Sequence, residues 1–301
     1  MNRHIVLGFD METDIGSYLK SYKGVKTGTS RVLSILSRAG IRATFFFTGD
    51  AAEKNQDVVT EVARAGHEVG CHSLRHETVG DAHFNMPNDS PILEEELEHR
   101  LELNVRILER VTGRKPTAFR APRLWQGDAQ VQVLEKLGFL VDASYSVAAH
   151  KQMTVPYHPS RKNWLEPGDM RLLEIPNFAF QGNQDRFRRY FGRNDQWPLL
   201  RLLGARFVLE NLPPVVDEQL SRAPSACLLF YLHPWEFEPM PAKYRYDEGT
   251  FLFKPELHEN CGDRMTREFS LFVQRALDAG YQFGTCDEYR AFYEAQRGGQ
   301  G

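Results

Sequence analysis

The chain has 301 residues, a length that allows one large α/β domain or two ordinary ones. Hydrophobic residues make up 42% of the sequence, which is enough for a sizeable core. The formal net charge is −3, and the one basic cluster, at 186–193, is interpreted as a solvated face, so no nucleic-acid-binding surface is expected.

The cysteine pattern and the first residues bear on the cellular compartment. The four cysteines form no CxxC pair, so neither a disulfide framework nor a thiolate zinc site is expected. The first strand is predicted to begin at about residue 4, which leaves no room for a signal peptide. No apolar run reaches about 18 residues, so no transmembrane segment is expected. These features predict a cytoplasmic protein with free thiols.

A pattern of amphipathic stretch, glycine and short apolar run recurs along the chain. It is clearest over 32–47, 58–72, 131–144 and 272–285, and looser over 105–122. Glycine just after a helix suits the left-handed C′ position, and the β-rich run that follows is typical of a strand. Helices that alternate with strands predict an α/β fold with a parallel sheet or barrel.

The segments between these units are less regular. The longest helix is predicted over 90–113, with Ser90 as its cap and Pro91 in its first turn. Two stretches rich in proline and glycine, 154–170 and 236–262, are predicted to be irregular loops.

No linker composition divides the chain. We therefore expect a single domain over 1–301, elaborated by loops near 145–225 and 236–262. A further strand is predicted over 226–233 and a final helix over about 286–296.

Polar side chains follow five predicted strands at the point where each strand ends. They are Asp10, His72, Arg120, Asp142 and His233. Ligands of parallel α/β folds bind at the carboxyl ends of the strands. Five such residues together therefore indicate one site on one face.

His72 and His76 stand four residues apart, directly after a predicted strand. On a helix or tight turn this spacing brings both imidazoles to one face. An isolated HxxxH is more often a pair of surface or packing histidines, but the position after a strand favours a site. A carboxylate from FDMETD (9–14) would complete a set of two histidines and one carboxylate, which suits catalytic Zn²⁺ and other divalent metals.

Five short motifs follow one another along the chain: GFDMETD (8–14), HSLRH (72–76), RAP (120–122), DAS (142–144) and LHP (232–234). This ordered set resembles the polysaccharide deacetylases of carbohydrate esterase family 4, the nodulation-protein-B homology domain. The resemblance covers roughly 5–145 and 225–290. It implies a distorted (β/α)7 barrel of parallel strands with outer helices. It also implies a metal-dependent hydrolase that removes an N-acyl group, N-acetyl in the first instance, from an amino sugar or its conjugate.

The resemblance implies roles for individual residues. Asp10 would be the base that takes the proton of the attacking water, with Arg120 as its ion-pair partner. His233 would protonate the leaving amine as general acid. Asp142 would lie behind His233, raise its pKa and select its tautomer.

The carboxylate ligand departs from the family's common first motif, which has two adjacent aspartates. Here Met11 occupies the second position and cannot serve as a hard oxygen ligand. Glu12 is the next candidate to join His72 and His76, because residues two apart in an extended segment point the same way. Asp14 stays open as an alternative ligand but is interpreted as a solvated turn residue. The implied cofactor is a divalent metal, with Zn²⁺ first and Co²⁺, Ni²⁺ or Mn²⁺ as alternatives.

Four further residues are predicted to contact the substrate. The rings of Trp125 and Trp235 could stack on a sugar or pack in the barrel mouth. A backbone N–H near Leu124 or Trp125 could stabilise an oxyanion, and Glu236 could position the substrate or cap its loop.

The expected partner is a small molecule or saccharide, and the sequence leaves open whether the protein is a monomer or a homo-oligomer. Two other functions also stay open. One is a cytoplasmic deformylase or cyclic amide or imide hydrolase on the same scaffold. The other is a non-catalytic carbohydrate-binding relative.

Overall fold

A computed structural model describes residues 2–79, 91–180, 196–247 and 249–298. The basic cluster at 186–193 and the predicted cap Ser90 lie outside these residues. No helix of the described part is long and apolar enough to cross a membrane. All four cysteines are unpaired.

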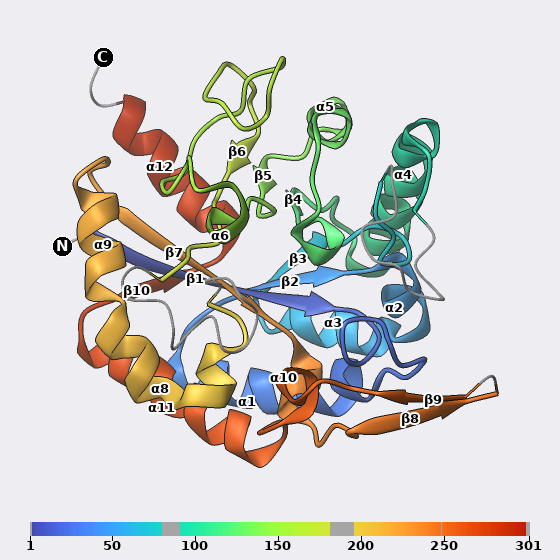
Figure 1. Ribbon diagram of the computed structural model, residues 1–301. Coiled ribbons are helices and arrows are strands. Elements are labelled where there is room, and N and C mark those ends of the chain that lie inside the picture. The colour runs from blue at the N-terminus through green and yellow to red at the C-terminus, as the bar shows by residue number, and fades with distance from the viewer. Residues whose placement is uncertain (1, 80–90, 181–195, 248, 299–301) are drawn as a thin grey trace.

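Seven parallel strands of the described chain curl into a distorted barrel (Figure 1). They are β1 (Arg3–Met11), β2 (Thr44–Phe47), β3 (Glu68–Cys71), β4 (Ala118–Phe119), β5 (Val141–Asp142), β6 (Leu173–Glu174) and β7 (Ala226–Leu232). They pair in chain order from β1 to β6, and β7 pairs with the other edge of β1. A single bridge between Asn177 and Leu229 joins the segment after β6 to β7. The predicted α/β class and the distorted seven-stranded barrel are confirmed.

Helices surround the strands on the outside (Figure 1). They are α1 (Thr29–Ala39), α2 (Gly49–Lys54), α3 (Gln56–Arg64), α4 (Glu94–Thr112), α5 (Asp128–Leu137), α6 (Val147–His150), α8 (Leu199–Asn211), α9 (Pro213–Leu220), α10 (Pro255–His258), α11 (Asp263–Asp278) and α12 (Cys286–Gly298). An eighth strand, β10 (Gln282–Gly284), pairs with the first half of β1.

The recurring helix–glycine–strand units are present as predicted. Gly40 and Gly138 follow α1 and α5 with φ of 64° and 80°, the left-handed conformation that glycine adopts without steric cost. The long helix is confirmed, but α4 begins at Glu94, after Pro91. Its cap is Leu93, whose backbone N–H donates to Glu96 Oε2 at 3.1 Å. Glu96 thus supplies the cap from within the first turn of the helix.

Of the two stretches predicted to be irregular, one is more ordered than the sequence predicts. The stretch 236–262, expected to be irregular, contains α10 and an antiparallel hairpin of β8 (Lys243–Tyr246) and β9 (Gly249–Leu252). The hairpin is held from outside its own sequence, since the rings of Phe251 and Tyr18 stack at 5.9 Å. The loop 154–170 has no strand or helix, as predicted.

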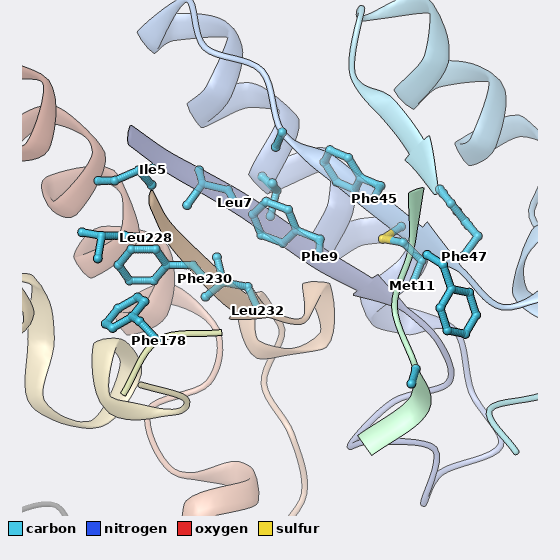
Figure 2. Packing of buried hydrophobic residues seen from close by; sticks show 14 of the residues in the cluster. Ile5, Leu7, Phe9, Met11, Phe45, Phe47, Phe178, Leu228, Phe230 and Leu232 are labelled. Atoms are coloured by element: carbon cyan, nitrogen blue, oxygen red, sulfur yellow. The ribbon is translucent and has the colours of Figure 1, made fainter. Parts of the chain in front are cut away.

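The alternation of side chains along the strands divides the core into two layers. The odd-numbered side chains of β1 face the outer layer between barrel and helices, as Figure 2 shows for Ile5, Leu7, Phe9 and Met11. The inner layer consists of Val6, Phe46, Ala118, Val141, Ala143, Leu173, Ile175, Cys227, Leu229, Cys286 and Tyr289. Two of these come from α12, which therefore contributes to the barrel interior. Asp10, two pleats beyond Val6, lies on the same inner face toward the carboxyl ends of the strands.

Candidate active site and metal centre

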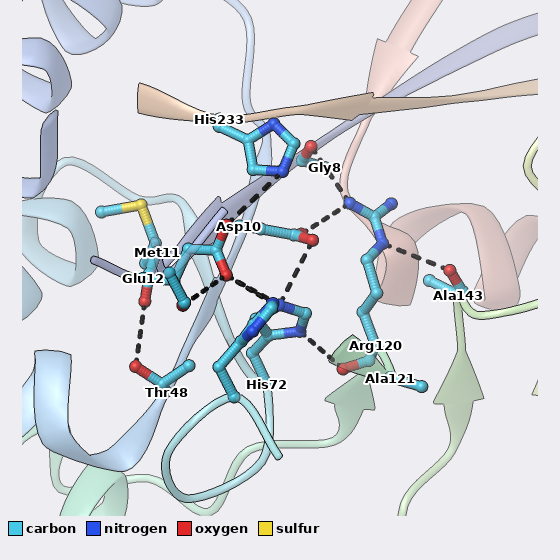
Figure 3. Close-up of polar contacts among 12 residues, drawn as sticks. Gly8, Asp10, Met11, Glu12, Thr48, His72, Arg120, Ala121, Ala143 and His233 are labelled. Atoms are coloured by element: carbon cyan, nitrogen blue, oxygen red, sulfur yellow. Dashed lines mark hydrogen bonds and ion pairs between the residues drawn. The ribbon is translucent and has the colours of Figure 1, made fainter. Parts of the chain in front are cut away.

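Three side chains that could ligate a metal converge at the carboxyl ends of β1 and β3. The candidate ligand atoms of Glu12, His72 and His76 all lie within 4.8 Å of one another, and all three residues are buried. His76 Nε2 is 2.5 Å from Glu12 Oε2, and His72 Nε2 is 3.9 Å from the same oxygen. Figure 3 shows the carboxylate of Glu12 directed toward His72 while the side chain of Met11 points the other way. The two-residue spacing at the end of β1 thus places Asp10 and Glu12 on one face.

His72 is held in the tautomer that a metal ligand needs. Its Nδ1 lies 2.7 Å from the carbonyl oxygen of Arg120. A carbonyl only accepts hydrogen bonds, so Nδ1 carries the proton and Nε2 presents its lone pair. Within the described residues, His72 Nε2 and Glu12 Oε1 are buried without a hydrogen-bond partner. Buried polar atoms without partners are rare, and two nitrogens with one carboxylate oxygen are donors that Zn²⁺ accepts, so these residues fit a divalent metal.

The pKa shifts of Glu12 and His72 also favour metal binding. Burial by itself raises the pKa of Glu12, but the imidazoles, above all that of His76, outweigh it and lower this pKa to about 2. Burial lowers the pKa of His72, and the nearby Asp10 carboxylate only partly opposes this. An ionised carboxylate and a neutral imidazole are the protonation states in which these side chains bind a metal.

Asp10 lies beside this group, oriented by a buried arginine. Arg120 Nη1 donates to Asp10 Oδ1 at 2.8 Å, and Arg120 also donates to the carbonyls of Gly8 and Ala143, each at 3.2 Å. A Cβ atom on Gly8 would lie 2.4 Å from Arg120 Nη2, so a glycine is required where the guanidinium crosses β1. Asp10 Oδ2 has no hydrogen-bond partner in the described chain and lies 3.4 Å from His72 Nε2. One oxygen of Asp10 is thus fixed and the other faces the metal group (Figure 3).

His233 approaches the group from β7 on the other side. Its Nε2 is 3.7 Å from Glu12 Oε1, and its Nδ1 is 3.3 Å from Glu236 Oε1. Burial lowers the pKa of His233, but the carboxylates of Glu236 and Glu12 outweigh burial and raise it above its ordinary value. The carboxylate behind His233 is therefore Glu236, which sequence reasoning assigned to substrate contact or loop capping.

Glu236 is buried and fully engaged. Its Oε1 accepts from Trp197 Nε1 at 2.9 Å and from the backbone N–H of His233 at 3.0 Å. Its Oε2 accepts from Arg201 Nε at 2.9 Å. Both oxygens being occupied, Glu236 positions His233 and has no free oxygen for a substrate.

Asp142 does not lie behind His233, so that expectation is corrected. Its neighbours Val141 and Ala143 belong to the inner layer, and the two-residue period of a strand therefore turns Asp142 outward. There its carboxylate accepts from the side chains of Ser144 and Gln126. Five polar residues do end five strands, but four of them share the inner face and Asp142 does not.

A buried acid pair involving Asp142 predicts a pH dependence of stability. Burial raises the pKa of Asp142 to about 6, and burial together with Asp142 raises that of Glu174 well above its ordinary value. As pH rises from about 3.8 through about 6, the unfolded chain ionises first and the folded state loses stability. Urea unfolding across this range should show a smaller fall in unfolding free energy for Asp142→Asn than for the wild type. An equal fall in both proteins contradicts the prediction, and Asp169→Asn on the exposed loop serves as control.

Asp14 is buried, which corrects its interpretation as a solvated turn residue. It accepts hydrogen bonds from the backbone N–H groups of Gly24 and Lys23 at 2.8 and 3.0 Å and from the Ser21 hydroxyl at 2.5 Å. These bonds hold the loop after β1 against the helical turn Gly24–Gly28. Both oxygens of Asp14 are used, and Glu12 is the acid that joins the two histidines.

The residues predicted to contact the substrate differ in how accessible they are. Trp235 is only 1% exposed, because it packs in a buried cluster with Ile15, Leu19 and Phe253. The N–H groups of Leu124 and Trp125 donate to Ala121 and Pro122 within their own turn, so neither is free to bind an oxyanion. The ring of Trp125 is 39% exposed and donates to the carbonyl of Val79, which leaves it as a contact at the rim.

Sequence reasoning missed the loops that surround the site. Ser17 donates to Glu12 Oε2 at 3.1 Å, and Ser17, His76 and Arg123 have left-handed φ of 67°, 59° and 58°. Non-glycine residues adopt this conformation rarely, and such strain is concentrated at functional sites. These loops enclose a cavity of about 280 Å³. His76 lines this cavity and is also a member of the metal group. The glycine-containing run IGS (15–17) after three acids is the one signal in the sequence that could have pointed to it.

Comparison with known proteins agrees with these features. A family model described as polysaccharide deacetylase matches residues 2–141, which carry the first three motifs. The peptidoglycan-N-acetylglucosamine deacetylase of Bacillus cereus is 27% identical over 198 residues, covering 64% of this chain and 65% of the relative. The peptidoglycan deacetylase of Helicobacter pylori is 24% identical over 203 residues, covering 58% and 66%. The chain thus spans just under two thirds of the length of these relatives.

Solved structures extend the likeness in fold to nearly the whole chain. A Mycobacterium smegmatis protein assigned as a polysaccharide deacetylase superposes with a TM-score of 0.65 at 17% identity, covering 98% of this chain and 91% of that one. The allantoinase Puue superposes with a TM-score of 0.60 at 15% identity, covering 97% and 90%. Residues 2–141, which match the family model and carry the first three motifs, thus belong to the polysaccharide deacetylase family, and nearly the whole chain shares the fold of the solved structures.

Proposed function

We propose that the protein is a metal-dependent hydrolase that removes an N-acyl group, N-acetyl in the first instance, from an amino sugar or its conjugate. The observation that carries the proposal is the buried group of Glu12, His72 and His76, with Asp10 3.4 Å from His72. The family relationship supplies the substrate class, because two relatives are named for deacetylating peptidoglycan.

The metal and the protein would divide the chemistry. A divalent cation held by Glu12, His72 and His76 would polarise the acyl carbonyl and lower the pKa of water. Asp10, which Arg120 holds in place, would accept the proton of the attacking water on its unpartnered oxygen.

His233 is placed to act at the other end of the scissile bond. Its Nε2 faces the same space as Glu12, and its raised pKa lets it carry a proton near neutral pH. It would give this proton to the nitrogen that leaves when the amide C–N bond breaks. Base and acid on opposite sides of the metal group are what hydrolysis of an amide requires.

The test is turnover by the full chain after reconstitution with Zn²⁺ or Co²⁺. We expect release of acetate from at least one N-acetylated amino sugar or oligosaccharide, and loss of that release on removal of the metal with a chelator. Sugar binding without any turnover in every metal-loaded form contradicts the proposal and supports the non-catalytic alternative.

Replacement of Glu236 tests the assignment of His233. Because Glu236 raises the pKa of His233, the basic limb of the kcat/KM profile of Glu236→Gln should move to lower pH. Glu238→Gln is the matched control, since Glu238 is a neighbouring acid that pairs with Arg31 at 2.9 Å. An unmoved basic limb in Glu236→Gln, with the fold verified by circular dichroism, contradicts the role of His233 as general acid.

A second candidate is hydrolysis of a cyclic amide or imide, or deformylation of an amino sugar conjugate, by the same residues. The compact cavity of about 280 Å³ beside the metal group favours a small substrate of this kind. The allantoinase Puue, similar in fold, is named for such a reaction. A panel that contains hydantoin-like rings, N-formyl sugars and N-acetyl sugars distinguishes the candidates by which bond is cleaved fastest.

A further inference from the structure

The cavity next to the metal group has an unusual charge. Its wall includes four cationic side chains, those of Lys20, Lys54, Arg75 and Arg123, and one carboxylate, that of Asp50. The four cations come from four different segments, which follow β1, β2, β3 and β4. Folding thus brings four positive charges from separate segments of the chain to one small space.

Three of these cations, Lys20, Lys54 and Arg75, have no ion-pair partner within the described residues. Ion pairs occur over much of the surface of this part of the chain, such as Lys136 with Glu98 at 2.7 Å, but no carboxylate there lies within ion-pair distance of Lys20, Lys54 or Arg75. The single acid, Asp50, accepts a hydrogen bond from the Tyr22 hydroxyl at 2.6 Å. Converging like charges repel one another, and an anion in the cavity would relieve this repulsion.

The cavity is poorly suited to a neutral sugar chain. Neutral sugars are bound by exposed aromatic faces, but among the described residues the one tyrosine, phenylalanine or tryptophan of this wall, Tyr22, has Lys54 Nζ 5.3 Å above its ring. The volume of about 280 Å³ lies just below the range of about 300–1,000 Å³ that holds drug-sized ligands. A single compact group fits this space.

We propose that the substrate carries an anionic group, a phosphate or a carboxylate, which Lys20, Lys54, Arg75 and Arg123 bind in this cavity while the amide lies at the metal group. His76 lines the cavity and is also one of the three metal-group residues. The anion and the amide would therefore be neighbouring groups on one small molecule. Thr48, whose hydroxyl bonds to the carbonyl of Met11 in Figure 3, adds a hydroxyl to the same wall. The inference rests on the proposed function for the position of the amide, while the anion site stands on the cavity itself.

Calorimetric titration of the full chain tests the anion site independently of turnover. The probes are N-acetylglucosamine 6-phosphate, N-acetylmuramic acid and neutral N-acetylglucosamine. We expect one of the two anions to bind at least about tenfold more tightly than the neutral sugar, since hydrogen bonds between charged groups are the stronger ones. Which anion binds more tightly distinguishes phosphate from carboxylate. Binding of the anions should weaken as salt is raised from about 0.05 to 0.5 M.

The double variant Lys20→Gln/Lys54→Gln removes two of the four charges without touching residues next to the histidines. It should lower the preference for the anion over the neutral sugar by about tenfold or more, while Lys136→Gln on the outer helix α5 keeps the wild-type preference. Equal binding of anionic and neutral sugars by the wild type, or an unchanged preference in the double variant, overturns the inference.

The outcomes separate the two proposals. Turnover of neutral N-acetyl sugars with no preference for anions contradicts the proposed anion site and leaves the proposed deacylation intact. Tight anion binding that depends on the lysines, with no turnover of any amide by the metal-loaded protein, supports the anion site and contradicts the proposed function.

Discussion

Replacement of Asp10 with Asn is expected to lower kcat by about 10²–10⁴-fold, the usual contribution of a general base. The asparagine keeps the shape of the carboxylate but cannot take a proton from water. Since Asp10 is not among the three clustered ligands, bound Zn²⁺, measured by metal analysis, should stay near one per chain. The measurement is steady-state turnover of the best substrate found in the panel.

The control for this variant is a carboxylate of equal burial on the other face of the barrel wall. Asp142 is as fully buried as Asp10 but points away from the site, so Asp142→Asn should keep most of the activity. Loss of Asp10 also leaves Arg120 buried without its acid, which costs about 3–5 kcal/mol when a buried pair is broken. Activity is therefore compared well below the melting temperature of each variant. Full activity in Asp10→Asn contradicts the account.

Replacement of Glu12 with Gln is expected to weaken Zn²⁺ binding by more than about 100-fold. Loss of a residue that only supports a ligand already costs about 10–100-fold, and Glu12 is a candidate ligand itself. Turnover at limiting Zn²⁺ should fall with the affinity. Competition with a chromogenic chelator measures the affinity directly.

Asp14→Asn is the matched control for Glu12→Gln, because it alters the other acid of the same short loop. Asp14 bonds to backbone groups of the loop, so its loss should lower the melting temperature and leave Zn²⁺ affinity within severalfold of the wild type. The reverse pattern, with affinity lost in Asp14→Asn and kept in Glu12→Gln, contradicts the proposed ligand set.

The first strand shows what sequence reasoning could reach. The alternation of Asp10, Met11 and Glu12 along a strand predicts that the two acids share a face, and the structure places them so. Met11 packs in the outer layer, opposite the acids. This prediction succeeds because β1 is nine residues long and its period is unambiguous.

The fifth strand shows where such reasoning stops. β5 has only two residues, and the run FLVDAS is apolar on both sides of Asp142. A strand of two residues is too short for the alternation of inward and outward side chains to be recognised in the sequence. The end of the strand can therefore be predicted, but not the face to which its last side chain points. The position of Asp142 follows from pairing with β4 and β6, which is a property of the assembled barrel.

The partner of His233 depends on contacts that are remote in sequence. Arg201 and Trp197 hold Glu236 from a segment more than 30 residues earlier. The helix that carries Arg201 has no continuous amphipathic pattern, because Gly204 interrupts it with φ of 89°. Burial of Trp235 likewise depends on packing with Ile15 and Leu19, which are more than 200 residues away in sequence.

A crystal structure of the full chain grown with Zn²⁺, with anomalous data collected on both sides of the zinc edge, would locate the metal and identify its ligands. We expect one strong anomalous peak bonded to Glu12, His72 and His76, with Asp10 outside the coordination shell and Arg120 still paired to Asp10. A peak that excludes Glu12, or a fully occupied site elsewhere with none between the two histidines, would contradict this expectation.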